Sequence, residues 1–149
     1  DAASLREIAL EPGTDFRFGI DGIMTGWVLL SGEPALAELE QEKVVARTVL
    51  SANGVEVPVP FGETYSVLQV IRFFRDYEPD LMSEDRLKQS LRLMLDRPTF
   101  ADLVINELIR VQDWAIMDRL MKMYDAKEFD MPAIKRAIIR YFYAASRDA

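Results

Sequence analysis

The sequence predicts an all-α protein, an irregular helical repeat of about six to eight helices, and three observations carry that prediction. Two stretches of the chain, residues 65–96 and 112–143, repeat the same order of residue types. Apolar residues recur with the spacing of amphipathic helices from residue 64 onward. Prolines and small polar residues separate these runs where helices would end and begin.

The repeat emerges when the two stretches are aligned at an offset of 47 residues. Their apolar positions then coincide, and the identities are Arg72 with Arg119, Tyr77 with Tyr124 and Lys88 with Lys135. Each stretch has the pattern of a helix, a short polar turn and a second helix. Because one helical hairpin cannot bury its apolar face alone, the repetition predicts a stacked array.

The N-terminal part of the chain predicts a pair of helices. Residues 1–15 have weak periodicity, whereas apolar residues that include Phe16 suit a buried helix over about 16–31. Gly22 and Gly26 lie one turn apart on that helix, and each costs roughly 1 kcal/mol against alanine, so we expect close backbone packing there. Pro34 suits the first turn of the next helix.

Residues 51–62 carry conflicting signals. Asn53-Gly54 between two apolar runs is typical of a β-hairpin turn. Pro58 and Pro60 would each remove a hydrogen-bond donor from the second strand. The sequence therefore predicts a loop, with a small hairpin as the alternative.

The C-terminal part predicts helices over about 64–77, 84–96, 100–112, 114–124 and 132–146. Tyr77 falls on the apolar face of the first of these helices, and Ser83 suits the N-cap of the second. The apolar positions of all the helices together predict a core that includes Trp27, Val67, Ile71, Phe74, Leu91, Leu95, Leu103, Leu108, Met117, Leu120, Ile138 and Phe142.

The stretch from Tyr65 to Ala145 resembles an α-solenoid of the HEAT or armadillo kind, and Asp130-Met131-Pro132-Ala133-Ile134-Lys135-Arg136-Ala137-Ile138 is similar to the start of a HEAT second helix. The extra helix over 100–112 departs from the HEAT pattern. The resemblance implies binding to other macromolecules and supplies no catalytic residues. We expect one domain over 1–149, with a helix pair and loop over 1–62 and repeated hairpins over 63–149. The chain starts with Asp1 rather than methionine, so we expect it to be part of a longer protein.

Composition narrows the function classes. The 149 residues include neither histidine nor cysteine, which excludes Ser-His-Asp and Cys-His catalysis and histidine-ligated zinc within this chain. Residues 1–64 carry 11 acidic and 4 basic residues, a net charge of −7, whereas 65–149 are neutral with 14 of each. Because nucleic-acid binders present a basic surface, we expect no nucleic acid. The most apolar run, 20–30, contains Asp21 and is too short to span a membrane.

Four groups of residues are candidates for chemistry, and each has a simpler interpretation. The alternate carboxylates Asp76, Glu78 and Asp80 match the first positions of a calcium-binding loop. Such a loop needs glycine at its sixth position and glutamate at its twelfth, and both are leucine here, so we interpret these residues as a solvated turn. The turn with Asp125, Glu128 and Asp130 receives the same interpretation. Gly19, Gly22 and Gly26 match no phosphate-binding pattern. Glu63, Asp21 and Asp15 are interpreted as caps or surface residues rather than an acid–base pair. We expect no catalytic residues, metal or cofactor.

Candidate partner-contact residues lie on the predicted last helix. Arg136, Arg140, Tyr143 and Arg147 form one stripe, and arginine and tyrosine are favoured in protein interfaces. A solvated outer face is the alternative. Arg72 and Arg119 join the candidates because they occupy equivalent repeat positions.

These observations favour a non-enzymatic protein-interaction or scaffold module, whose partner is another protein or flanking repeats of the parent chain. The alternative is an all-α accessory or ligand-binding domain of a larger enzyme. An open groove would favour the first interpretation and a closed apolar pocket the second. The acidic residues Glu33, Glu38, Glu40 and Glu42 and the basic stripe of the last helix further predict weak head-to-tail association, sensitive to salt and to charge reversal of Arg136 and Arg140.

Overall fold

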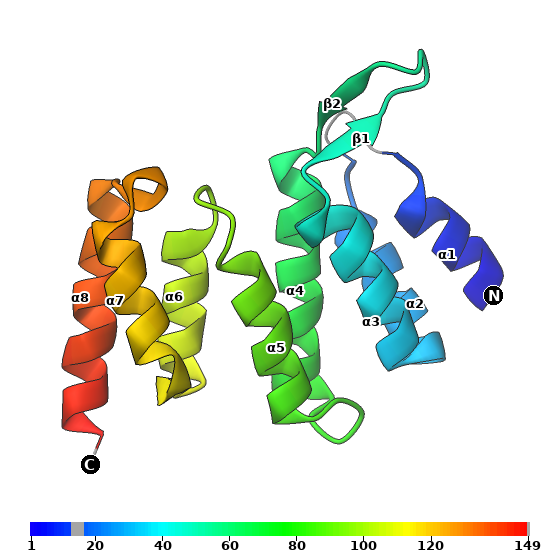
Figure 1. Cartoon of the computed structure of the whole chain (residues 1–149). Coiled ribbons are helices and arrows are strands. Elements are labelled where there is room, and N and C mark those ends of the chain that lie inside the picture. Colours follow the sequence, from blue (N-terminus) through cyan, green and yellow to red (C-terminus); the bar gives the residue numbers. More distant parts are fainter. Residues whose placement is uncertain (13–16, 149) are drawn as a thin grey trace. The chain divides into compact units, whose positions relative to one another are not determined.

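The computed structural model describes residues 1–12 and 17–148, and it is mostly helical, which confirms the all-α prediction. Within the described residues lie eight α-helices: α1 Ala2–Leu10, α2 Ile20–Ser31, α3 Glu33–Leu39, α4 Phe61–Tyr77, α5 Glu84–Met94, α6 Ala101–Arg110, α7 Met117–Asp125 and α8 Pro132–Arg147 (Figure 1). The chain separates into two compact units, Asp1–Ser90 and Leu91–Ala149, with the boundary inside α5. None of the described helices is long and apolar enough to cross a membrane.

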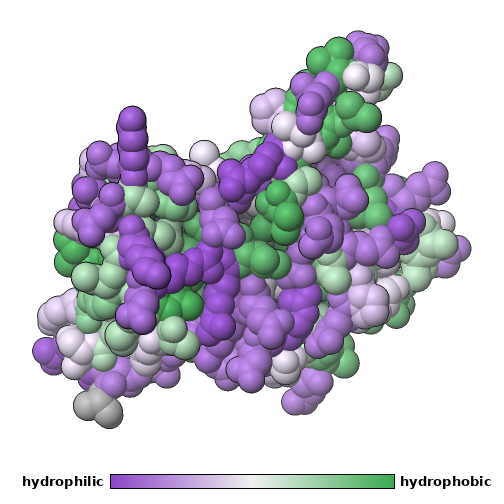
Figure 2. Space-filling view, in the orientation of Figure 1, coloured by the Kyte–Doolittle hydropathy of each residue, from purple (hydrophilic) through white to green (hydrophobic). Residues whose placement is uncertain are grey.

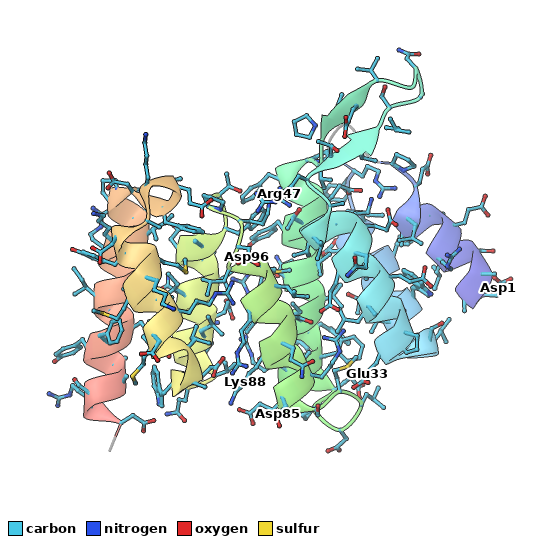
Figure 3. The ribbon with its side chains drawn as sticks, viewed as in Figure 1. Asp1, Glu33, Arg47, Asp85, Lys88 and Asp96 are labelled. Atoms are coloured by element: carbon cyan, nitrogen blue, oxygen red, sulfur yellow. The ribbon has the colours of Figure 1, made fainter. Side chains whose placement is uncertain are left out.

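In the first unit, α2 packs against α1, α3 and α4. Helix α1, where the sequence showed only weak periodicity, begins at Asp1 (Figure 3), whose carboxylate accepts a hydrogen bond from the amide of Ser4. An N-cap of this kind satisfies one of the orphan donors of the first turn. A β-carbon on Gly26 would lie 3.4 Å from Leu5 Cδ1, an ordinary van der Waals contact, so α1 meets Gly26 through a side chain and not through the close backbone approach that we expected. Gly22 has nothing within 4 Å of that position.

Helix α2 begins at Ile20, so the predicted start near residue 16 is too early: residues 17–19 precede the helix, and Phe16 lies outside the described residues. Helix α3 continues into a π-helical segment, η1, over Glu40–Val45. Its last bond runs from the amide of Ala46 to the carbonyl of Gln41, five residues back. The wider turn places the side chains of Glu40 and Lys43 inside the unit.

The loop predicted for 51–62 is wrong, because the chain forms a hairpin of β1 Thr48–Leu50 and β2 Glu56–Pro58. Pro58 opposes Thr48. The adjacent pair is joined by a hydrogen bond from Val59 to Arg47, and the pair three positions away by one from Ser51 to Val55, so alternation of the ladder makes Pro58 a non-hydrogen-bonded position. Its missing N–H therefore costs no ladder bond. Gly54, at φ +75°, closes a three-residue loop.

The hairpin exposes apolar side chains. Leu50 is 61% exposed and Val55 is 58% exposed, and apolar surface is visible on the hairpin in Figure 2. Only Val59, just after β2, is buried in this part of the chain.

Helix α4 buries Val67, Leu68, Val70, Ile71 and Phe74, as its pattern predicts. The same pattern placed Tyr77 on the apolar face, and this is wrong in burial: Tyr77 is the last residue of the helix and is 73% exposed. Ser83 caps α5 as predicted, because its hydroxyl accepts from the amide of Arg86.

In the second unit, α8 packs against α6 and α7. The 3₁₀ turns η2 Trp114–Ile116 and η3 Lys127–Phe129 precede α7 and α8. Nine of the twelve predicted core residues are buried across the chain. The other three, Leu103, Met117 and Phe142, are half-buried because their helices turn them toward the edge of the packed face.

The two predicted repeat stretches have similar helix boundaries. Helix α4 ends at Tyr77 and α7 at Asp125, while α5 begins at Glu84 and α8 at Pro132, so the offset of 47 reproduces both ends within one residue. Helix α4 has 17 residues, however, and α7 has 9. A HEAT-like superhelix stays a prediction.

Candidate functional site

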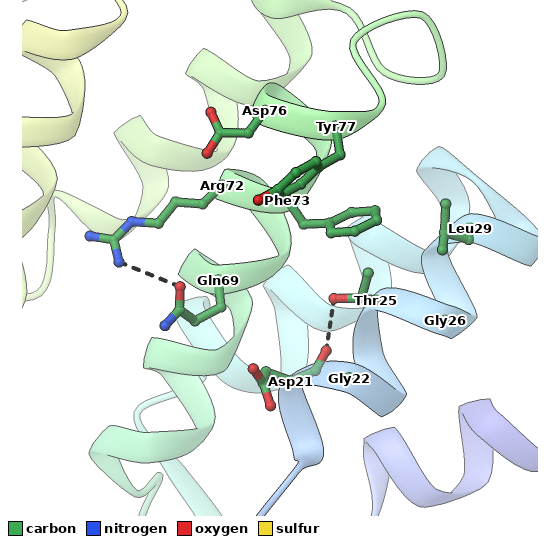
Figure 4. A pocket seen from close by; sticks show the side chains of 10 residues that line it. All are labelled: Asp21, Gly22, Thr25, Gly26, Leu29, Gln69, Arg72, Phe73, Asp76 and Tyr77. Carbon is green, nitrogen blue, oxygen red and sulfur yellow. Dashed lines mark hydrogen bonds between the residues drawn. The ribbon is translucent and has the colours of Figure 1, made fainter.

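A groove lies along one side of α2 and α4, and its C-terminal half is shown in Figure 4. This hollow has a volume of about 560 Å³. On each helix the successive lining residues are one or three positions apart, so every one has a partner three or four positions away and all lie on one helical face. They are Asp21, Gly22, Thr25, Gly26 and Leu29 of α2, and Gln69, Arg72, Phe73, Asp76 and Tyr77 of α4.

A second hollow of about 430 Å³ continues the groove toward the N-terminal ends of both helices. It shares Asp21 and Gln69 with the first. Its lining runs over residues 17–21 and 62–69, whereas the first hollow is lined by later residues of each helix. The two helices therefore run in the same direction, and one groove follows both.

Exposed aromatic rings stand at the two ends of this groove. At one end Phe18 is 94% exposed, and Phe61 stacks on Tyr65 with ring centroids 5.8 Å apart. At the other end Phe73 and Tyr77 lie 5.4 Å apart, and Tyr77 is largely exposed. Large apolar side chains are costly to leave in water, and aromatic rings are enriched in protein interfaces.

No large side chain of α2 fills the middle of the groove. Gly22 has no side chain, and the hydroxyl of Thr25 points back to its own helix. The Thr25 hydroxyl donates to the carbonyl of Asp21, 2.8 Å away, so it is satisfied within α2 (Figure 4). A side chain at position 22 would project into open space.

The charges of the groove stand on its walls. The carboxylate of Asp21 has no hydrogen-bond or ion-pair partner among the residues that the structure describes. Asp76 pairs with Arg75 at 2.9 Å. The Arg72 guanidinium extends away from α2 and donates to Gln69 (Figure 4). It also donates to the hydroxyl of Tyr65.

A buried ion cluster holds the N-terminal end of α4. Glu63, whose side chain is 2% exposed, accepts from Arg17 at 2.5 Å and from Lys43 at 3.0 Å. Arg17 also donates to the carbonyl of Ile8, and Lys43 to that of Glu11. The cluster thus ties the end of α1, the π-helical segment and the start of α4 together. Buried charges require such pairing, because desolvation alone would be prohibitive.

A second buried carboxylate joins the π-helical segment to α5. Glu40 accepts from Arg86 at 2.5 Å and from the hydroxyl of Ser90. The hydrogen bond to Glu40 raises the pKa of Arg86 above its ordinary value, so the guanidinium stays charged.

These clusters correct two expectations from the sequence. Glu63 is not a cap or surface residue but a buried counterion of two cations. Glu40 does not belong to the acidic surface, and Glu38 pairs with Arg6 at 2.8 Å, so Glu33 and Glu42 are the exposed remainder of that predicted cluster. Asp15 lies outside the described residues.

The predicted basic stripe lies on one exposed face of α8. Arg136, Arg140 and Arg147 are exposed, and Tyr143 is 63% exposed with the Arg147 guanidinium 5.7 Å from its ring centre. Arg140 donates to Asn106 Oδ1 at 2.7 Å. The structure adds Ile139, which is 57% exposed on the same face.

The two repeat arginines have different surroundings. Arg72 forms part of the groove wall, whereas Arg119 of α7 donates to the carbonyl of Arg92 and to Asp96. Asp130 of the second acidic turn pairs with Lys135 at 3.3 Å. Among the described residues, no three acidic side chains gather as metal ligands would.

Sequence reasoning did not find the groove. Gly22 and Gly26 were assigned to helix packing, and Tyr77 to the apolar face of its helix. The space beside Gly22 is open because of the direction in which α4 runs relative to α2, and a local sequence pattern does not predict that direction. The one available signal was a short helix carrying two glycines and a threonine, residues too small to fill a helix–helix groove.

Comparison with protein-family models gives no match, and neither do comparisons with curated proteins and with solved structures.

Proposed function

We propose that this chain is a non-enzymatic protein-interaction module that receives a helical segment in the groove along α2 and α4. The observation that carries the proposal is the continuous groove between exposed aromatic clusters at its two ends. Helix-in-groove recognition uses such a surface, with apolar side chains of the bound helix seated between two helices of the receptor.

The geometry supports a macromolecular segment over a small molecule. Each hollow alone has the volume of a small-molecule site, which keeps the alternative of a ligand-binding accessory domain open. Small-molecule sites, however, enclose most of the ligand, and the walls here are exposed at Asp21, Gly22 and Tyr77. An open groove suits a segment that enters from the side.

A selection experiment tests the proposal. Helical peptides displayed as a library are selected on the immobilised chain, and the enriched peptides are measured by calorimetry. We expect amphipathic peptides that lose about tenfold or more of their affinity for Gly22→Phe, since the ring would fill the middle of the groove. The variant should fold, because position 22 has open space and phenylalanine has a higher helix propensity than glycine.

Ala37→Phe is the matched control, because Ala37 is exposed on α3 and does not line the groove. Peptides that bind Gly22→Phe as tightly as the unchanged chain would contradict the proposal. If no peptide is enriched and a parallel screen of small apolar compounds finds binding that Gly22→Phe removes, the ligand-binding alternative is favoured.

A further inference from the structure

The length of the groove limits its occupant. It follows α4 from Gly62 to Tyr77, which is about 22 Å at 1.5 Å per residue. An occupying helix of the same length has about four turns. The aromatic clusters at Tyr65 and at Phe73 are eight residues apart on α4, or about 12 Å, so they can contact apolar residues two turns apart on that helix.

One described helix of this chain has the required length and surface. Helix α8 has 16 residues, about 24 Å, and packs on α6 and α7 with only one face. Its outer face combines Ile139 and Tyr143 with the arginines at 136, 140 and 147. Exposed apolar side chains bordered by arginine are typical of a surface that becomes buried in an interface.

Charge favours contact between this face and the groove. The unit Asp1–Ser90 contains 16 acidic and 8 basic residues, a net charge of −8, and Leu91–Ala149 contains 9 and 10, a net charge of +1. On the groove wall, Asp21 offers a carboxylate that no described side chain neutralises. An arginine from an incoming helix would supply the counterion.

We infer that the outer face of α8 in one copy of the chain docks in the groove along α2 and α4 of a second copy. The inference rests on the proposed function, because it uses the same groove. Two different surfaces meet in this contact, so it is heterologous and each added copy leaves one groove and one α8 face available. The assembly therefore grows head to tail with concentration.

The association is weak and salt-dependent. A single helix of four turns covers less surface than the roughly 1,200 Å² that mark the lower end of stable interfaces. The contribution of the exposed arginines is screened over about 8 Å at physiological ionic strength. Self-association is therefore expected at high protein concentration and low salt, and it decreases as salt is added.

Two complementary variants of the whole chain test the direction of the contact by sedimentation equilibrium. Gly22→Phe fills the groove and leaves α8 unchanged, while the double variant Arg136→Glu/Arg140→Glu reverses the α8 face and leaves the groove unchanged. We expect each variant alone to stay monomeric where the unchanged chain forms larger species. Mixed in equal amounts, they should form a 1:1 dimer that grows no further, because each supplies the surface that the other lacks.

Glu42→Lys and Lys127→Glu serve as controls, since both are exposed charge reversals outside the two surfaces, and they should self-associate like the unchanged chain. Mixed variants that stay monomeric would overturn the inference, as would self-association of either variant alone. Peptide binding that is lost in Gly22→Phe would still support the groove in that case, so failure of this inference is distinguishable from failure of the proposed function.

Discussion

Glu63 in the first unit and Asp113 in the second are equally buried carboxylates, but the cations that pair with them differ in exposure. Both side chains are 2% exposed. Glu63 is paired with Lys43, which is 4% exposed, and with Arg17, which is 21% exposed. Asp113 is paired in bidentate fashion with Arg92, which is 35% exposed.

From this difference we expect the burial of the cation to decide how much stability is lost when the carboxylate is removed. Without the Glu63 charge, the ammonium of Lys43 would stay inside the first unit with no carboxylate, and a buried unpaired charge is strongly destabilising. Without the Asp113 charge, the guanidinium of Arg92 can turn toward water. Two carboxylates that look alike by their own exposure therefore contribute differently to stability.

The largest expected effect is that of Glu63→Gln. We expect a loss of about 3–5 kcal/mol in the free energy of unfolding, because the variant leaves Lys43 buried without a charged partner. Urea denaturation followed by the fluorescence of Trp27 measures the first unit, in a background in which Trp114→Phe removes the other tryptophan.

Adding Lys43→Met to Glu63→Gln gives the control. Because the second change removes the buried ammonium, the double variant should be less destabilised than the sum of the single variants. Additive losses would show that the two side chains are not coupled as the structure indicates.

Asp113→Asn should cost less, about 1–2 kcal/mol. Asparagine keeps an acceptor for the amide of Ala115, and the exposed side of Arg92 regains water. Unfolding followed by Trp114, in a Trp27→Phe background, reports on the second unit. A loss as large as that of Glu63→Gln would break the comparison drawn from cation burial.

Tyr141→Phe should have the smallest effect at neutral pH, about 1 kcal/mol, from the loss of the bond to the carbonyl of Asp113. Burial first, and the charge of Asp113 second, raise the pKa of Tyr141 to about 12, from an ordinary value of 10.0. The contribution of the neutral phenol is therefore fully present below pH 10 and is lost as pH rises toward 12.

The test is the difference in unfolding free energy between Tyr141→Phe and the unchanged chain at pH 7, 10 and 11.5. We expect the difference to shrink in the last step, since only the unchanged chain loses stability by titration of this residue. A constant difference across the series would show that the phenol of Tyr141 titrates like that of an exposed tyrosine.

The helical class, most helix boundaries and most of the core could be predicted from the sequence, because amphipathic spacing, Pro132 and the Ser83 cap act within one or two turns. The basic face of α8 was equally readable, since its residues share one helix. Local patterns also explain two errors. Pro58 was interpreted as a strand breaker without knowledge of its register, and Tyr77 was placed on the apolar face because its spacing fits that face.

Only the tertiary structure decided the groove, the direction of α4 relative to α2 and the burial of Glu40, Lys43 and Glu63. The side chains of those ion pairs are 20 to 46 positions apart in the chain. A charged side chain can be buried only when it is paired with an opposite charge. Here the partner is distant in the sequence, so the residues adjacent to each charge do not predict its burial. Gly22 likewise marks a hollow only because α4 passes beside α2 with residues that leave the space above it open.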